Sequence, residues 1–156
     1  MIQWGGRGAT RRKKSGICNS DREDYMDIDQ FHELMDEISA GIPEEILRDL
    51  NGGIVLLPEA KLHRDDLAGN LYTLGEYRVQ IPGMGRYVAI FYGSFIKVHG
   101  LHPNRRKLRE ELRKTLLHEL RHHLESLAGV RDLEVFDDEQ IAKYKEQHKK
   151  TSSSDT

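Results

Sequence analysis

Apolar residues near the start of the folded region repeat with the spacing of a helix. Four of them stand at positions i, i+3, i+4 and i+7, which predicts an amphipathic helix over 29–40 with Asp27 or Asp29 as its cap. A short second helix is expected from Pro43 to about Leu50, because acidic residues directly follow the proline and favour the positive end of a helix dipole. The four apolar residues of the first helix are Phe31, Leu34, Met35 and Ile38.

Three or four strands are expected in the middle of the chain. The compact apolar run 54–57 predicts a buried strand. Residues 71–74 and 77–80 are expected to form two strands on either side of Gly75–Glu76, which is expected to be a hairpin turn or a bulge. The segment 87–92 is rich in β-branched and aromatic residues, so it is the strongest strand candidate.

Helical spacing returns in the last third of the chain. A long helix is predicted from Pro103 to about Ala128, with Gly129 at the position that ends it. A last helix is expected over 137–149. These elements predict an α+β fold with N-terminal helices, a small twisted sheet of three or four strands, a long helix against the sheet, and a C-terminal helix.

Composition divides the chain into one domain with two polar ends. Residues 1–27 hold few apolar residues and a basic stretch over 11–14, so we expect a disordered arm. Residues 28–149 are expected to form the domain. Residues 150–156 are expected to form a polar tail.

Charge, hydropathy and cysteine content exclude several classes of protein. The 156 residues include 24 Lys+Arg and 26 Asp+Glu, so we expect no nucleic-acid partner. No apolar run reaches the roughly 18 residues of a membrane span, so we expect no membrane partner either. The single cysteine, Cys18, excludes a disulfide framework and a multi-thiolate zinc site. These features together predict a cytoplasmic protein of one domain.

The long predicted helix carries His-Glu-x-x-His at His118, Glu119 and His122. In a helix the two histidines lie one turn apart on one face, so both imidazoles can bind a single Zn²⁺ at roughly 2.0–2.1 Å. Glu119 is rotated by about 100° and can reach the attacking water, where a general base is needed. His123 points away from the pair, and we expect it to orient a neighbour or pack at the core.

With this motif on a helix that follows strands, the chain resembles the minimal zincin-like metallopeptidases, a family of short bacterial proteins. The resemblance covers residues from about Phe31 to Ala142. It implies a small antiparallel or mixed sheet whose edge strand, here the segment 87–92, precedes the active-site helix. It also implies a zinc peptidase with His118 and His122 as ligands and Glu119 as the base.

The third zinc ligand is expected among the acidic residues that follow the motif. The family pattern has Gly-x-x-Asp three residues after the second histidine, whereas here Gly129 comes seven residues after it, about one helical turn farther. Asp132 is the first candidate, because Gly129 lets the chain leave the helix and return from another direction. Glu125 shares the histidine face, but three ligands on one straight helix give poor tetrahedral geometry. Glu134 and Asp137 are further alternatives.

The sequence therefore predicts a Zn²⁺-dependent peptidase that cleaves peptide or protein substrates with a metal-activated water. The strand 87–92 is expected to hold the substrate by strand addition if it borders the cleft. A metal-binding or chaperone-like module without hydrolytic activity is one alternative. A non-haem iron protein is another, because two histidines and a carboxylate also form a facial triad. Glu119 distinguishes the peptidase, since only a hydrolase needs it as a base.

Overall fold

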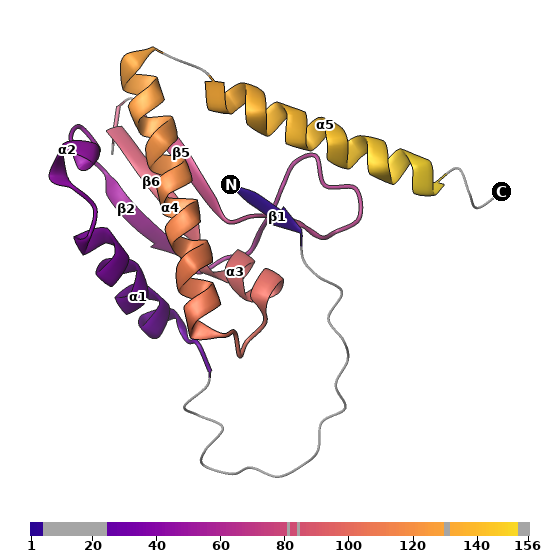
Figure 1. Cartoon of the computed structure of the whole chain (residues 1–156), viewed down its shortest axis with the longest axis horizontal. Coiled ribbons are helices and arrows are strands. Elements are labelled where there is room, and N and C mark those ends of the chain that lie inside the picture. Colours follow the sequence, from indigo (N-terminus) through magenta and orange to yellow (C-terminus); the bar gives the residue numbers. More distant parts are fainter. Residues whose placement is uncertain (5–24, 81, 84, 130–131, 153–156) are drawn as a thin grey trace, which may run out of the picture.

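The computed structural model describes residues 1–4, 25–80, 82–83, 85–129 and 132–152. Within these residues the fold is α+β, as predicted, with five helices and two three-stranded sheets (Figure 1). In the same part of the chain, no helix is both long and apolar enough to cross a membrane.

The larger sheet is mixed and has the order β2-β6-β5. Strand β2 (Gly53–Leu57) pairs in parallel with β6 (Gly85–Phe91), and β5 (Gly75–Gln80) pairs with β6 in the antiparallel direction. The predicted edge position of 87–92 is therefore wrong, because β6 is the central strand. Its residues 87–91 are all buried, as expected for a strand with neighbours on both sides. The edge strand on the side of the long helix is β5.

The smaller sheet has the order β1-β4-β3, formed by β1 (Ile2–Trp4), β4 (Leu71–Thr73) and β3 (Lys61–Leu62). Strands β4 and β5 lie in different sheets, so the first of the two alternatives predicted at Gly75–Glu76, a hairpin turn, is wrong. The chain instead passes from one sheet to the other through the fully buried Leu74, whose carbonyl accepts a hydrogen bond from the Phe91 N–H at 2.9 Å.

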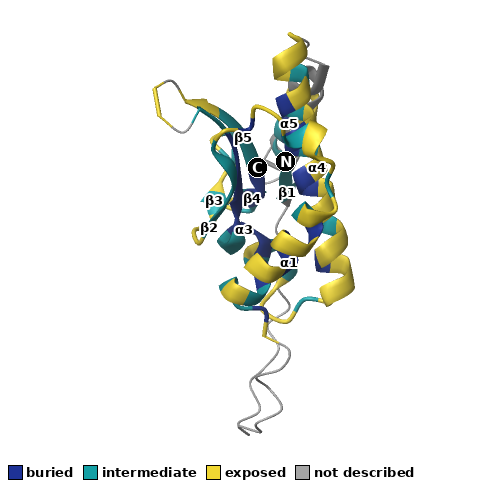
Figure 2. Ribbon diagram, turned by 90° about the vertical axis from the view of Figure 1, so that its left-hand side faces the viewer, coloured by how far each residue is buried: buried dark blue, intermediate teal, exposed yellow. Residues whose placement is uncertain are grey.

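Two helices cover one face of the larger sheet, as the side view shows (Figure 2). Helix α1 (Ile28–Ala40) begins at a capping box formed by Asp27 and Gln30, and α4 (Arg105–Ala128) packs beside it on β5 and β6. Val88 and Ile90 point from β6 into the core beneath these helices. The predicted end of α4 is confirmed, because Gly129 ends it with φ 73°. Its start lies two residues after the predicted Pro103, because Asn104 caps the helix.

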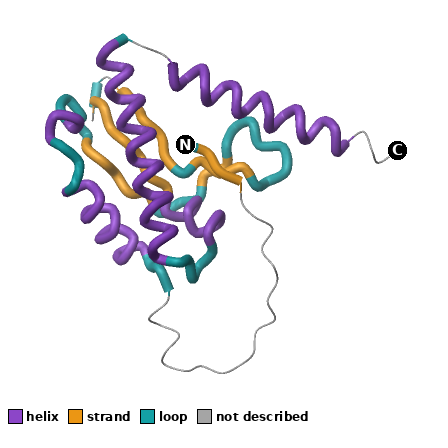
Figure 3. The backbone as a smooth tube through the Cα atoms, viewed as in Figure 1, coloured by secondary structure: helices purple, strands orange, loops and turns teal. Residues whose placement is uncertain are grey.

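The remaining helices are α2 (Glu44–Leu47), α3 (Tyr92–His99) and α5 (Asp132–Ser152). The backbone trace shows α5 returning from the end of α4 toward the smaller sheet (Figure 3). There Ile141 and Tyr144 pack against Leu71 of β4, with Ile2 of β1 at the edge of the cluster. The last helix therefore covers the smaller sheet.

Of the arm expected to be disordered over 1–27, the structure describes residues 1–4 and 25–27, which pack on the domain, and residues 5–24 lie outside the described residues. Ile2 pairs with Thr73 in β1, and Met26 is buried in the main core. A few apolar residues are enough to dock a short segment when a sheet edge is available. The basic stretch 11–14 and Cys18 lie outside the described residues.

Candidate functional site

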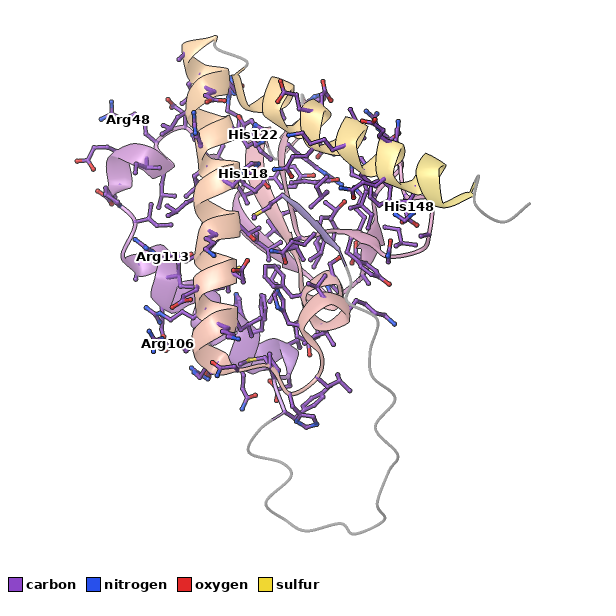
Figure 4. All side chains as sticks on the ribbon, turned by 45° about the vertical axis from the view of Figure 1, so that its right-hand side comes forward. Arg48, Arg106, Arg113, His118, His122 and His148 are labelled. Carbon is purple, nitrogen blue, oxygen red and sulfur yellow. The ribbon has the colours of Figure 1, made fainter. Side chains whose placement is uncertain are left out.

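Helix α4 brings the two histidines of the motif together. His118 and His122 are half-buried, and their ring centroids lie 4.9 Å apart with the planes at 80°. Both side chains leave α4 on the same side (Figure 4). The spacing predicted from the sequence is therefore realised, and the two imidazoles fit the histidine part of a zinc site.

Glu119 lies on the sheet side of α4 and is only 2% exposed. Its Oε2 accepts a hydrogen bond from the backbone N–H of Tyr77 at 3.0 Å, and its Oε1 forms an ion pair with the α-ammonium group of Met1. A buried carboxylate is costly without such partners. The edge strand β5 and the first residue of the chain therefore hold the predicted base in place.

Gly75 is needed because α4 approaches β5 closely at this point. A Cβ atom on residue 75 would lie 2.9 Å from Cγ2 of Thr115 and 3.1 Å from Cγ of Glu119. Side chains on real residues almost never approach so closely. The glycine therefore sets the distance between the helix that carries the motif and the strand that binds Glu119.

A cavity of about 290 Å³ opens between β5, α4 and α5. Glu119 and His122 line it from α4, Tyr77 from β5, and Met1 from the N-terminal segment. The predicted base thus lies at the wall of a space large enough for part of a peptide. His118 is not among the lining residues.

Charged side chains surround this cavity. Burial raises the pKa of Glu76, but ion pairs with Lys61 and Arg78 outweigh burial and hold that pKa below its usual range. Burial lowers the pKa of His63, and its Nδ1 accepts the backbone N–H of Asp65 at 3.1 Å. The lining of the cavity therefore carries an ionised glutamate and a histidine that favours the neutral form.

The third metal ligand is not identified by the geometry. Among the residues that the structure describes, no three His, Cys, Asp or Glu side chains are placed to hold a metal ion. Glu125, the alternative on α4, accepts a hydrogen bond from Nε of Arg121 at 3.1 Å. Asp132, Glu134 and Asp137 belong to the first turns of α5, and their side chains lie outside the described part of the chain.

His123 orients a neighbour of the site, as expected. It is fully buried, with Nε2 2.7 Å from the Arg48 carbonyl and Nδ1 3.2 Å from the Tyr77 hydroxyl. A carbonyl only accepts hydrogen bonds, so Nε2 carries the proton and Nδ1 accepts from Tyr77. The Tyr77 hydroxyl also accepts from Arg86 at 2.7 Å. This chain of bonds fixes the residue whose backbone N–H binds Glu119.

Three contributors to the site were not predicted from the sequence: Met1, Gly75 and Tyr77. Met1 belongs to a segment whose composition gave no sign of order. Gly75 and Tyr77 are in the interval that was expected to be a turn and the strand after it. Only the unusual position of a glycine within an otherwise strand-like stretch could have signalled the close approach of another element.

No protein-family model and no curated protein matches the chain. A solved structure does match it, that of a conserved hypothetical protein from T. thermophilus, with 39% identity and a TM-score of 0.54. The match covers 65% of this chain and 96% of that one. The chain belongs to the same protein family. Because the name of this T. thermophilus relative gives no activity, the function has to be argued from the site itself.

Proposed function

We propose that the protein is a zinc-dependent peptidase. The observation that carries the proposal is the placement of the motif: two neighbouring imidazoles on α4 and, between them in sequence, a carboxylate at the wall of a cavity. An ordinary solvated helix would not direct a glutamate into a buried position beside a sheet edge.

His118 and His122 would hold the metal, with Asp132 as the first candidate for the third ligand. A zinc ion bound there would supply Lewis acidity, lowering the pKa of a water toward 7 and polarising the scissile carbonyl. The identity of the metal separates this proposal from a non-haem iron protein, which would use the same two histidines.

Glu119 would act as the general base. Its carboxylate takes the proton of the attacking water and then passes it to the nitrogen of the leaving amine. The Tyr77 N–H at 3.0 Å keeps Oε2 fixed. Oε1, which pairs with the Met1 ammonium group in this structure, would be the oxygen that takes the proton once a substrate replaces Met1. The low exposure of Glu119 keeps this transfer away from bulk solvent.

Strand β5 would position the substrate, in place of the segment 87–92. The edge of β5 at Gly75 already uses its N–H and its carbonyl to bind a peptide segment, namely Met1. A substrate strand could add to the same edge, where its backbone would pass Glu119.

Replacing the base tests the proposal. We expect Glu119→Gln to keep the zinc content of the unmodified chain but to lower cleavage of fluorescently labelled casein by about 10²–10⁴-fold, because an amide cannot take the proton. Glu110→Gln is the matched control, since Glu110 is exposed on the same helix. Unchanged hydrolysis by Glu119→Gln would contradict the mechanism. Zinc binding without hydrolysis by the unmodified chain would favour the non-catalytic metal module.

A further inference from the structure

His63 lines the same cavity as Glu119 and His122, although it belongs to the smaller sheet. It directly follows β3, and its N–H donates to the Leu71 carbonyl on β4 at 2.8 Å. Its side chain is 22% exposed, so a ligand in the cavity can reach the ring. No step of the proposed mechanism uses this histidine.

The loop that carries His63 is held in place by the last helix. The His63 carbonyl accepts the N–H of Asp66 at 2.9 Å, and the Asp66 carboxylate accepts the hydroxyl of Tyr144 at 3.0 Å. The neighbouring Asp65 pairs with Lys145 at 2.6 Å. Because both partners belong to α5, the loop is fixed before a ligand arrives, and binding costs little additional order.

The contacts of the His63 ring define which nitrogen carries the proton. Nδ1 accepts the backbone N–H of Asp65 at 3.1 Å, so in the neutral ring the proton lies on Nε2. Burial lowers the pKa of His63 and outweighs the carboxylates of Asp65 and Glu76, which raise it, so the neutral ring is favoured. Within the described part of the chain, no group accepts a hydrogen bond from Nε2. The ring therefore has one N–H donor left for a ligand.

The charges around the cavity select the kind of group that can bind this donor. Among the described side chains that line the cavity, carboxylates outnumber the guanidinium group of Arg64, which itself pairs with Asp65 at 3.6 Å. An anionic ligand would be repelled by these carboxylates, and a cation cannot accept a hydrogen bond. A carbonyl oxygen is neutral and accepts, so it meets both conditions. The carboxylates are those of Asp65, Glu76, Glu119 and Asp138.

A peptide bound along β5 has carbonyl groups that this strand cannot satisfy. A strand bonds its neighbour on one side only, and the remaining backbone groups of an edge strand face the other side without partners. A substrate strand on β5 therefore directs part of its carbonyl groups toward the other walls of the cavity. A carbonyl that loses water there without finding a donor weakens binding.

We infer that the Nε2–H group of His63 donates a hydrogen bond to a carbonyl oxygen of the bound peptide, which makes His63 a positioning residue for the substrate. The identity of the ligand, a peptide, rests on the proposed function. The hydrogen bond itself requires neither the metal nor cleavage. It would hold the peptide across the cavity from Glu119 and fix its register along β5.

NMR of histidine-labelled full chain, purified with its own metal, tests this hydrogen bond directly. Proton–nitrogen correlation spectra report the protonation of each ring, and the His63 signal is identified by its loss in His63→Asn. We expect the proton of His63 on Nε2 at neutral pH. We also expect its Nε2 signal to shift saturably as acetyl-Ala-Ala-Ala-amide is added up to tens of millimolar. The signal of the exposed His102 should not move.

Two substitutions separate the donor from the contact within the loop. His63→Asn keeps an oxygen near the position of Nδ1 that can accept the Asp65 N–H, but it has no group at the position of Nε2. His63→Gln places an amide N–H near Nε2 and gives up the acceptor. We expect the peptide to bind about threefold to tenfold more weakly to His63→Asn, and within about twofold of the unmodified affinity to His63→Gln. Shifts of the backbone amide signals of β5 measure binding in all three proteins.

The proton spectrum of the peptide shows in the same tube whether it is cleaved, which separates this inference from the peptidase proposal. A saturable shift of the His63 signal supports the hydrogen bond with or without cleavage. Cleavage with an unmoved His63 signal would overturn it and leave the peptidase proposal standing. An unmoved signal without cleavage would overturn it as well. Weaker binding to His63→Gln than to His63→Asn would show that His63 acts only through its loop, and would also overturn the inference.

Discussion

Single buried polar residues hold the candidate site together, and each has a partner on another element. His123 joins α4 to the carbonyl of Arg48 and to the hydroxyl of Tyr77 on β5. The sequence could place His123 away from the metal-binding face, because helical spacing fixes the direction of each side chain. It could not name the two partners, since they are 75 and 46 residues away in the chain.

We expect His123→Leu to destabilise the protein by about 1–3 kcal/mol, because the fully buried His123 ring loses its hydrogen bonds to the Arg48 carbonyl and the Tyr77 hydroxyl. Urea denaturation monitored by circular dichroism would measure this change in the free energy of unfolding. His102→Leu serves as the control, since His102 is exposed. Equal stability of the two variants would show that the buried hydrogen bonds of His123 contribute nothing.

We expect Gly75→Ala to cost about 1–3 kcal/mol of stability, because the new methyl group would overlap the Cγ2 atom of Thr115. The double variant Gly75→Ala/Thr115→Ser removes that atom but keeps the hydroxyl, so part of the loss should return. Thermal unfolding of the single and double variants measures the coupling. If Thr115→Ser gave no recovery, the close approach of α4 to β5 would not be the cause.

At the scale of whole elements, helices were predicted better than strands. Helix α4 carries its own signals, an apolar stripe and a glycine at its end, so its bounds followed from local sequence. The neighbours of a strand are not encoded locally. The segments 71–74 and 77–80 look like the two arms of a hairpin, yet they belong to different sheets because β4 pairs with β1 and β3, and β5 with β6.

Helix α5 is fastened to the β3–β4 loop by Asp66, which provides a test through pH. Burial raises the pKa of Asp66, but backbone N–H groups of Leu71, Asn70 and Gly69 and the hydroxyl of Tyr144 lower it more, so the net pKa lies below its usual value. A lowered pKa in the folded state adds stability above the unfolded value of about 3.9, and that stability is lost as the pH falls through the folded pKa.

We therefore expect Asp66→Asn to melt several degrees below the unmodified protein at pH 7, with a difference that narrows as the pH falls below about 4. Differential scanning calorimetry across this pH range measures it. Asp36→Asn, at an exposed position of α1, should melt within a degree or two of the unmodified protein throughout. A gap between Asp66→Asn and the unmodified protein that stays constant with pH would contradict the assigned role of the carboxylate.

At the scale of the whole molecule, the cavity beside Glu119 forms where the two sheets, α4, α5 and the first residues of the chain meet. The sequence could predict the motif because its three residues lie within one helix. The sequence could not predict this cavity, because residues separated by up to 118 positions meet there, as Met1 and Glu119 do. Such long-range contacts depend on the assembled fold, which local patterns do not specify.

The central claim is that His118 and His122 form a zinc site, and the zinc content of the purified, untagged full chain tests it most directly. Elemental analysis after dialysis should find about one zinc per chain in the unmodified protein. We expect the same in His102→Ala, which removes one exposed histidine, and far less in His122→Ala, which removes a ligand. Equal zinc in all three proteins would contradict the claim.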